Sequence, residues 1–391
     1  MESVHKKEQG REAEIGQQPT STKKKLGLIV NPIAGMGGSV GLKGTDGEDN
    51  VRKAIQLGAT PTAPRRAVEA LRELSPLKGS IELVTYPYEM GEEECKECGF
   101  NPVVIGYVKR GRTSAADTKK AAKEMLSREV DLLLFTGGDG TARDIHEAVG
   151  QRLPVIGVPA GVKVHSSVFA INPRTAGQLA IAYLRGEVGL REAEVMDVDE
   201  EAFRQNRVSA RLHGYLKIPH NDQLVQNVKV GSTLDEEESM QAIALEIVEN
   251  MHDEYLYIIG PGTTAKAVMK ALHLRYTLLG VDVVQKKRLI AADANEARLL
   301  ELIGDKKAKI IVSVIGGQGY VFGRGNQQIS PKVIRKVGKG NIIIAATESK
   351  IAALRGMPLL VDTGDREVDE MLKGYCRIVT GYRKSAVYRI A

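Results

Sequence analysis

Asp139 is the side chain whose type and surroundings point most directly to chemistry. It lies in Gly137-Gly138-Asp139-Gly140-Thr141, between the apolar run 131–136 and a helical pattern. Glycines let a backbone approach a ligand closely, and the free N–H groups at a helix N-terminus favour a phosphate. A phosphate alone would not favour a carboxylate. Asp139 therefore suggests a group that orients or deprotonates a hydroxyl attacking phosphorus, or that helps to hold a metal. The alternative is a tight Asp-Gly turn.

The patterns around this loop alternate between strand and helix. Apolar runs at 25–32, 102–108, 131–136 and 153–161 are each followed by a glycine-bearing or helical stretch. Continuous apolar strands between helices predict an α/β fold with a parallel sheet covered on both faces. Ligands of such sheets bind at the carboxyl ends of the strands. Three of these ends are Asn31, Thr136 and Pro159.

Composition and pattern divide the chain into five parts. Residues 1–23 are polar and aperiodic and predict a disordered tail. We expect an α/β domain at 24–190, a β-rich connector at 191–235, a second α/β lobe at 236–350, and strands returning to the core at 351–391.

The second lobe has its own candidate phosphate loop. Gly260, Gly262, Thr263 and Thr264 could cradle a phosphate at a helix start, and the alternative is a plain turn with Thr263 as the N-cap. Arg324 lies in the long glycine-rich stretch 314–330, where it could clamp a phosphate or belong to a surface loop.

Two acids of the second lobe are candidate substrate ligands. Asp282 and Asp293 each follow an apolar run, and an acid at a strand end can bind a ribose hydroxyl. An N-cap position would explain Asp293 equally well.

Three segments together resemble a known superfamily. "TGGDGT" resembles the signature of the NAD kinases, diacylglycerol kinases and sphingosine kinases, "LIVNPIAGMGG" (28–38) resembles the phosphate loop of the lipid kinases, and 157–170 lies where those enzymes carry a third motif. With "GPGTT" and "GQGYVFGRGNQQISP", the whole chain looks most like an archaeal and bacterial NAD kinase-like group. The resemblance implies a Rossmann-like three-layer domain with Asp139 as the catalytic residue. It assigns phosphate binding in this domain to Asn31, Gly35, Gly37, Gly38, Gly137, Gly138, Gly140, Thr141, Gly161 and Lys163.

The resemblance implies a kinase that uses ATP or polyphosphate with Mg²⁺ to phosphorylate the adenosine-ribose 2′-hydroxyl of NAD. The sequence departs from it in two places. The Asn-Glu pair that binds the ribose in NAD kinases is missing at its usual spacing, and Asn295-Glu296 looks like an ordinary helix N-terminus. Lys163 and His165 replace the Thr and Asn of lipid kinases, which makes His165 a candidate substrate-binding residue. Another hydroxylated metabolite as acceptor, or a nucleotide-binding regulator without catalysis, stays open.

Composition excludes other classes of function. Tryptophan is absent and aromatics make up 4%, so stacking on single-stranded nucleic acid is not expected despite a net charge of +6. No apolar run approaches the roughly 20 residues of a membrane span. Three cysteines give no disulfide framework, and the lone pair Cys95 and Cys98 leaves metal binding undecided. We expect a cytoplasmic homo-oligomer with no metal ligand assigned to a protein side chain.

Overall fold

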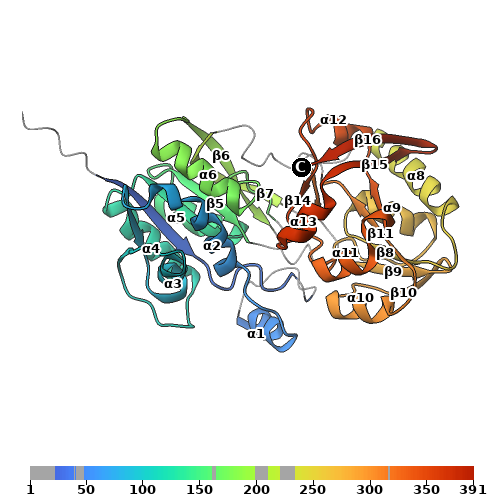
Figure 1. The fold of residues 1–391 in the computed structure, drawn as a ribbon, viewed down its shortest axis with the longest axis horizontal. Helices are drawn as coiled ribbons and strands as arrows, with labels where there is room; N and C mark the ends of the chain where they lie inside the picture. Colours follow the sequence, from blue (N-terminus) through green and yellow to red (C-terminus); the bar gives the residue numbers. More distant parts are fainter. Residues whose placement is uncertain are drawn as a thin grey trace, which may run out of the picture.

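The computed structural model describes residues 23–38, 40, 48–160, 164–198, 210–220, 234–315 and 318–391. The expected tail, the site candidates Gly161 and Lys163, and much of the expected connector lie outside these residues. The described chain forms two α/β lobes that lie side by side (Figure 1). No helix among the described residues has the length and apolar character that a bilayer span requires.

The first lobe is built on a parallel five-stranded sheet in the order β3-β2-β1-β4-β5. The central strands are buried because both faces are covered; all six residues of β4 are buried. The strands are β1 (Lys24–Val30), β2 (Ile81–Thr85), β3 (Val103–Val104), β4 (Leu132–Gly137) and β5 (Val155–Pro159). The predicted strand at 102–108 is thus reduced to two exposed residues at the sheet edge.

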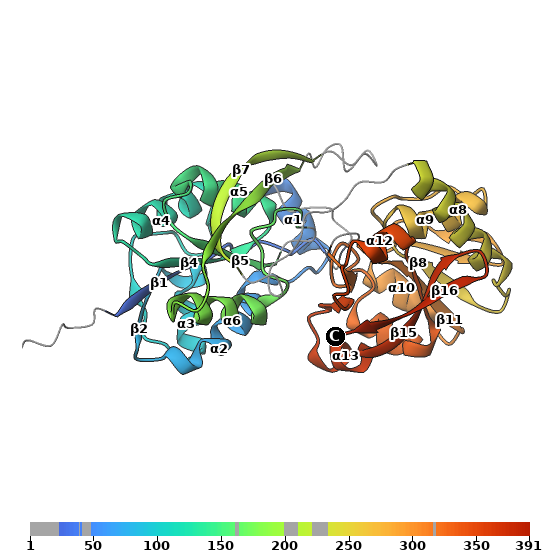
Figure 2. The same ribbon diagram turned by 90° about the horizontal axis from the view of Figure 1, so that it is seen from above.

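Helices cover both faces of this sheet. Helices α2 (Ala63–Glu73) and α6 (Pro173–Leu184) pack together on one face, and α4 (Ala115–Ser127) and α5 (Asp139–Val149) pack together on the other (Figure 2). Proline in the first turn of α2 and α6 suits a helix start, because a backbone N–H at that position would have no acceptor within the helix. Two shorter helices, α1 (Glu48–Gln56) and α3 (Glu92–Glu97), complete the lobe.

A long antiparallel hairpin follows the first sheet. It consists of β6 (Leu190–Val198) and β7 (Ala210–Pro219), and it packs against α5 and β5. Apart from its first residue, Leu190, the hairpin lies within 191–235, the part of the sequence that we expected to be a β-rich connector.

The second lobe contains a seven-stranded sheet in the order β10-β9-β8-β11-β13-β15-β16. Strands β8, β11, β13 and β15 are parallel to one another, and β9, β10 and β16 each pair antiparallel with their neighbours. The strands are β8 (Leu256–Ile259), β9 (Asp282–Gln285), β10 (Arg288–Ala291), β11 (Ala308–Ser313), β13 (Ile342–Ala345), β15 (Gly374–Gly381) and β16 (Lys384–Ile390). The C-terminal residues therefore supply two strands to this sheet.

Alternating residues of these strands bury two separate faces. Ile258 and Ile310 point toward α10 (Glu296–Ile303), α11 (Pro331–Val337) and α13 (Arg366–Leu372). Their neighbours Ile259 and Ile311 point toward α8 (Leu234–Glu249) and α9 (Thr263–Ala271). Outside this sheet lie α12 (Glu348–Ala352) and a small parallel pair formed by β12 (Tyr320–Phe322) and β14 (Leu360–Val361).

Candidate functional site

The predicted loops of the first lobe meet at the carboxyl edge of its sheet. β1 and β4 are neighbours, and the N–H of Asn31 donates to the carbonyl of Thr136 over 3.0 Å. The Asn31 side-chain amide donates to Thr141 Oγ1, also over 3.0 Å. The start of the 31–38 loop and the first turn of α5 are therefore in direct contact. A single phosphate site formed by both segments requires this contact.

Two glycines of these loops are required by packing within the protein. Gly35 has φ +78°, and a Cβ there would overlap the carbonyl oxygen of Ala160 at the end of β5. A Cβ on Gly137 would lie 2.5 Å from the Cβ of Thr141. Gly35 thus lets its loop approach the end of β5, and Gly137 lets the end of β4 approach the first turn of α5.

Asp139 is the first residue of α5, with Gly138 as the N-cap. Its Oδ1 accepts hydrogen bonds from Ser166 Oγ at 2.6 Å, Ser166 N at 2.9 Å and His165 N at 3.1 Å. Its Oδ2 accepts from His165 N at 2.8 Å and lies 3.2 Å from His165 Nδ1. The carboxylate thereby holds the buried stretch 164–171, which we call the 164–171 segment.

The contacts of Asp139 differ in how readily they can be exchanged. Three use backbone N–H groups, and Ser166 Oγ is itself held by the N–H of Met196 at 2.9 Å. The contact of the His165 ring is different, because the imidazole can move away from Oδ2 by rotation about its side-chain torsions. The position next to Oδ2 that the ring occupies is therefore where an incoming hydroxyl can meet the carboxylate. His165 was predicted as a site residue, whereas the role of Ser166 was missed.

The second lobe holds both ends of the 164–171 segment. Gln318 Nε2 donates to the carbonyl of Val164 over 3.3 Å, and Arg324 Nη2 donates to the carbonyl of Ile171 over 2.9 Å. Arg324 is buried, which excludes the alternative that it belongs to a surface loop. Its guanidinium also lies 3.4 Å from Asp362 Oδ2 and 4.9 Å from the centre of the Tyr320 ring.

Asp362 links the lobes a second time. Its carboxylate forms a buried ion pair with Arg66 on α2, and the Asp362 carbonyl accepts from the same guanidinium at 3.5 Å. Nothing in the sequence could have shown this contact, because the two residues are 296 positions apart and neither lies in a motif.

The candidate phosphate loop of the second lobe forms the start of α9. Gly262, with φ +103°, is the N-cap and Thr263 is the first helical residue, so Thr263 is not the N-cap that the alternative required. Thr264 is buried and its hydroxyl accepts from Lys350 Nζ at 2.7 Å. Gly260, at the end of β8, pairs with β11 through its N–H. The segment thus forms the expected strand, glycine loop and helix, and the Thr264 hydroxyl is hydrogen-bonded to Lys350 within the protein.

Asp282 begins strand β9 instead of following a strand, which corrects the prediction. It is fully buried, and its Oδ2 forms an ion pair with Lys266 at 2.8 Å. Thr277 donates to it through its N–H and hydroxyl, and the Asp293 N–H donates over 3.0 Å. Burial lowers the pKa of Lys266 to about 8, while Asp282 opposes the shift. The expected ribose ligand is thus the centre of a buried ion pair.

Asp293 follows strand β10, as predicted, but it is not the N-cap that the alternative required. It has φ +51°, and it does not cap a helix: the N-cap of α10 is Asn295, whose side chain accepts from the N–H of Arg298 at 3.0 Å. Asn295-Glu296 is therefore the ordinary helix N-terminus that the sequence indicated.

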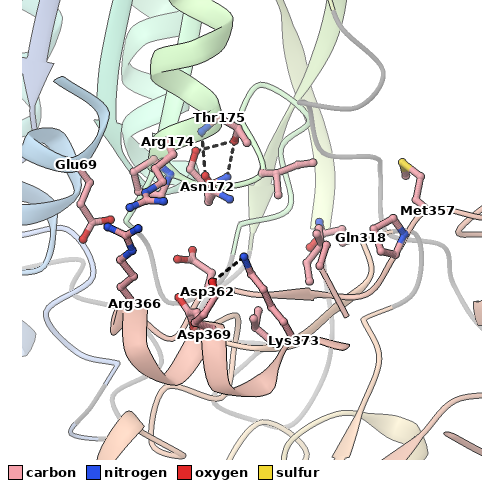
Figure 3. A pocket seen from close by; sticks show the side chains of 18 of the residues that line it. Glu69, Asn172, Arg174, Thr175, Gln318, Met357, Asp362, Arg366, Asp369 and Lys373 are labelled. Atoms are coloured by element: carbon pink, nitrogen blue, oxygen red, sulfur yellow. Dashed lines mark hydrogen bonds and ion pairs between the residues drawn. The ribbon is translucent and has the colours of Figure 1, made fainter. Parts of the chain in front are cut away.

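A wide cleft of about 1730 Å³ opens between the lobes. Figure 3 shows Glu69 on α2 and Arg174 on α6 facing Arg366 and Asp369 on α13 and Lys373 directly after it. Asp139 does not line this cleft. The two are connected through Gln318, which lines the cleft and holds the carbonyl of Val164, the residue before His165.

The described residues contain no cluster of three or more His, Cys, Asp or Glu that could hold a metal ion. Cys95 is buried on α3, and burial raises the pKa of its thiol, which disfavours the thiolate that a metal needs. Cys98 caps the same helix, and burial raises its thiol pKa too.

Comparison with known proteins gives two family matches. Residues 26–188 match the model of the ATP-NAD kinase N-terminal domain, and residues 252–390 match that of the ATP-NAD kinase C-terminal domain. No curated protein is significantly similar in sequence. Two solved structures of a candidate diacylglycerol kinase from Bacillus anthracis str. Sterne are 16% identical, with TM-scores of 0.24 and 0.23. The alignments cover 45% and 46% of this chain, and the chain spans less than half of each of those proteins, 46% and 45%.

Proposed function

Because the chain belongs to the family of NAD kinase-like proteins, we propose that it phosphorylates the 2′-hydroxyl of the adenosine ribose of NAD, with ATP or polyphosphate as donor, to give NADP. The observation that carries the proposal is the position of Asp139. This carboxylate stands at the N-terminus of α5, at the carboxyl edge of a parallel sheet and beside the 31–38 loop.

The donor phosphates would lie between the 31–38 loop and the first turn of α5. The free N–H groups and the positive dipole end of α5 favour negative charge at this point. Mg²⁺ would arrive with the donor, since it typically binds through substrate phosphates, waters and one or two carboxylates.

The acceptor hydroxyl would replace the His165 ring beside Asp139 Oδ2. In phosphoryl transfer the protein mainly positions the reactants and stabilises charge. Asp139 would accept a hydrogen bond from the hydroxyl, aim its oxygen at the phosphorus, and take the proton as the bond to phosphorus forms. The fixed donors from the 164–171 segment keep the carboxylate in one orientation for this task.

The cleft between the lobes supports a large acceptor. At about 1730 Å³ it exceeds the roughly 300–1,000 Å³ of typical small-molecule pockets, so a dinucleotide has room. The missing Asn-Glu pair favours one alternative, a different hydroxylated metabolite as the acceptor.

The test is incubation of the protein with Mg²⁺, NAD and either ATP or polyphosphate, followed by quantification of NADP. NADP formation that depends on donor and protein supports the proposal. Phosphorylation of another hydroxylated metabolite without NADP would replace the acceptor. Nucleotide binding with no transfer to any acceptor would contradict a kinase and favour a regulator.

A further inference from the structure

We propose that Gln318 and Arg324 of the second lobe are positioning residues, which hold the 164–171 segment so that it can orient the Asp139 carboxylate. The inference rests on the proposed function in one respect, the assignment of the reaction to Asp139. It gives the second lobe a defined task in the active site of the first, and it gives Arg324 a task other than phosphate binding.

The geometry places the two side chains at opposite ends of the segment. Gln318 binds the carbonyl of Val164 and Arg324 binds the carbonyl of Ile171. Between these two points, and among the residues that the structure describes, His165 and Ser166 supply the donors to Asp139. The carboxylate is therefore oriented by a segment whose ends are fixed from across the lobe boundary.

Both anchors are well suited to hold a position. Arg324 is buried, packs against the ring of Tyr320, and lies beside Asp362, so its guanidinium has little freedom. Asp362 is also paired with Arg66 of α2. One carboxylate of the second lobe thus binds an arginine from each lobe, and separating the lobes would leave charged groups without partners, which is costly.

Small displacements of this segment should affect the reaction more than the binding of substrates. A carboxylate that aims a nucleophile loses effect when it moves by a fraction of an ångström. The bulk of an acceptor would be held by the rest of the cleft, of which Gln318 lines only one point. Loss of an anchor should therefore lower kcat and leave KM nearly unchanged.

The first experiment is hydrogen–deuterium exchange of the full-length protein, read at the peptide that contains residues 164–171. Gln318→Ala removes the donor to Val164, and Gln318→Glu keeps the size but presents a carboxylate to the carbonyl. Both variants should exchange faster in this peptide than wild type. Gln178→Ala is the matched control, because Gln178 is exposed on α6 and contacts Glu73. Equal exchange in wild type, Gln318→Ala and Gln178→Ala would overturn the proposal.

The second experiment measures NADP formation. Loss of one hydrogen bond predicts a kcat about 3- to 10-fold lower for Gln318→Ala, with KM values within about twofold. Arg324→Ala should show both effects more strongly, and Arg324→Lys should restore part of the exchange protection because it keeps a charged donor. A rise in KM for the donor with unchanged kcat in Arg324→Ala would instead support phosphate binding and overturn positioning. If the wild-type protein makes no NADP, the proposed function fails, while the exchange result still decides whether the segment is anchored.

Discussion

Replacing Asp139 by asparagine gives the sharpest test of the proposed chemistry. The amide can adopt two orientations, and the contacts decide between them. With its NH₂ at the Oδ1 position it would oppose the N–H and hydroxyl of Ser166, whereas at the Oδ2 position it opposes the N–H of His165. The second orientation costs less, since it keeps all the contacts of Oδ1. We therefore expect the fold to survive with a loss of about 1.5–3 kcal/mol, the range for one charge-assisted hydrogen bond.

The effect on turnover should be much larger than this structural cost. An asparagine neither takes a proton nor attracts the hydroxyl as a carboxylate does, so the rate should fall about 100- to 10,000-fold. Turnover is measured as NADP formed per folded enzyme at saturating NAD and donor. Chemical denaturation of the same preparation gives the stability change, so that the two effects are separated.

Ser166→Ala is the matched control for this prediction. It removes the 2.6 Å contact to Asp139 but leaves the carboxylate and the backbone donors of the 164–171 segment in place. We expect a loss of at most about tenfold. Asp139→Asn with more than a tenth of wild-type turnover, or Ser166→Ala as damaged as Asp139→Asn, would refute a catalytic role and leave Asp139 as an anchor of the segment.

Three further predictions concern neighbouring parts of the molecule. Gly137→Ala should destabilise the fold by about 1–3 kcal/mol, because the added Cβ clashes with Thr141 on α5. Gly138→Ala should leave stability unchanged, since Gly138 has φ −119°, but it should weaken ATP binding in a calorimetric titration. If Gly138→Ala binds ATP as tightly as wild type, no phosphate binds at this turn. Lys266→Met should cost about 3–5 kcal/mol in urea unfolding because Asp282 stays buried without its cation, and a cost below about 1 kcal/mol would contradict this. Burial raises the pKa of Glu94 to about 7, so the folded protein keeps a proton that the unfolded chain releases above about pH 4.5. The free energy of unfolding should therefore decline as pH rises from about 4.5 toward 7, and Glu94→Gln should remove this decline. The same pH dependence in Glu94→Gln and wild type would contradict the prediction.

The first sheet was the easiest part of the fold to predict. Its inner strands are buried on both faces, so they are continuous apolar runs, and β4 lies where the run 131–136 placed it. The edge strand β3 follows no such rule, because an exposed edge needs no apolar face. In the second lobe, β9 has four residues and an antiparallel neighbour. No sequence pattern therefore indicated that Asp282 begins this strand, and the acid was expected to follow a strand instead.

The candidate site also has a part that the sequence could predict and a part that it could not. Asp139, Asn31 and the glycines between them belong to local motifs in which each residue explains its neighbours. The donors to Asp139 come from the following loop, and the sequence marked only His165 among them. Arg324 was noticed, but its destination depends on Asp362 and on a backbone carbonyl of the other lobe. Tertiary partners of this kind leave no periodicity and no fixed spacing, so residue types alone could not separate a phosphate clamp from a structural arginine.

The contacts across the lobes explain why a kinase of this family would need both. The first lobe contains Asp139, the 31–38 loop and the helix N-terminus, which are the expected parts of a phosphoryl-transfer site. Without the second lobe, the carbonyls of Val164 and Ile171 would lose their donors, and Arg66 would lose the carboxylate that neutralises it. The 164–171 segment would then be held only along its middle, where its backbone hydrogen-bonds to β5 and β6. His165 adjoins the end that Gln318 holds, and a loose end there would let its donors shift against Asp139. The second lobe therefore completes the set of anchors that keeps the carboxylate in one orientation.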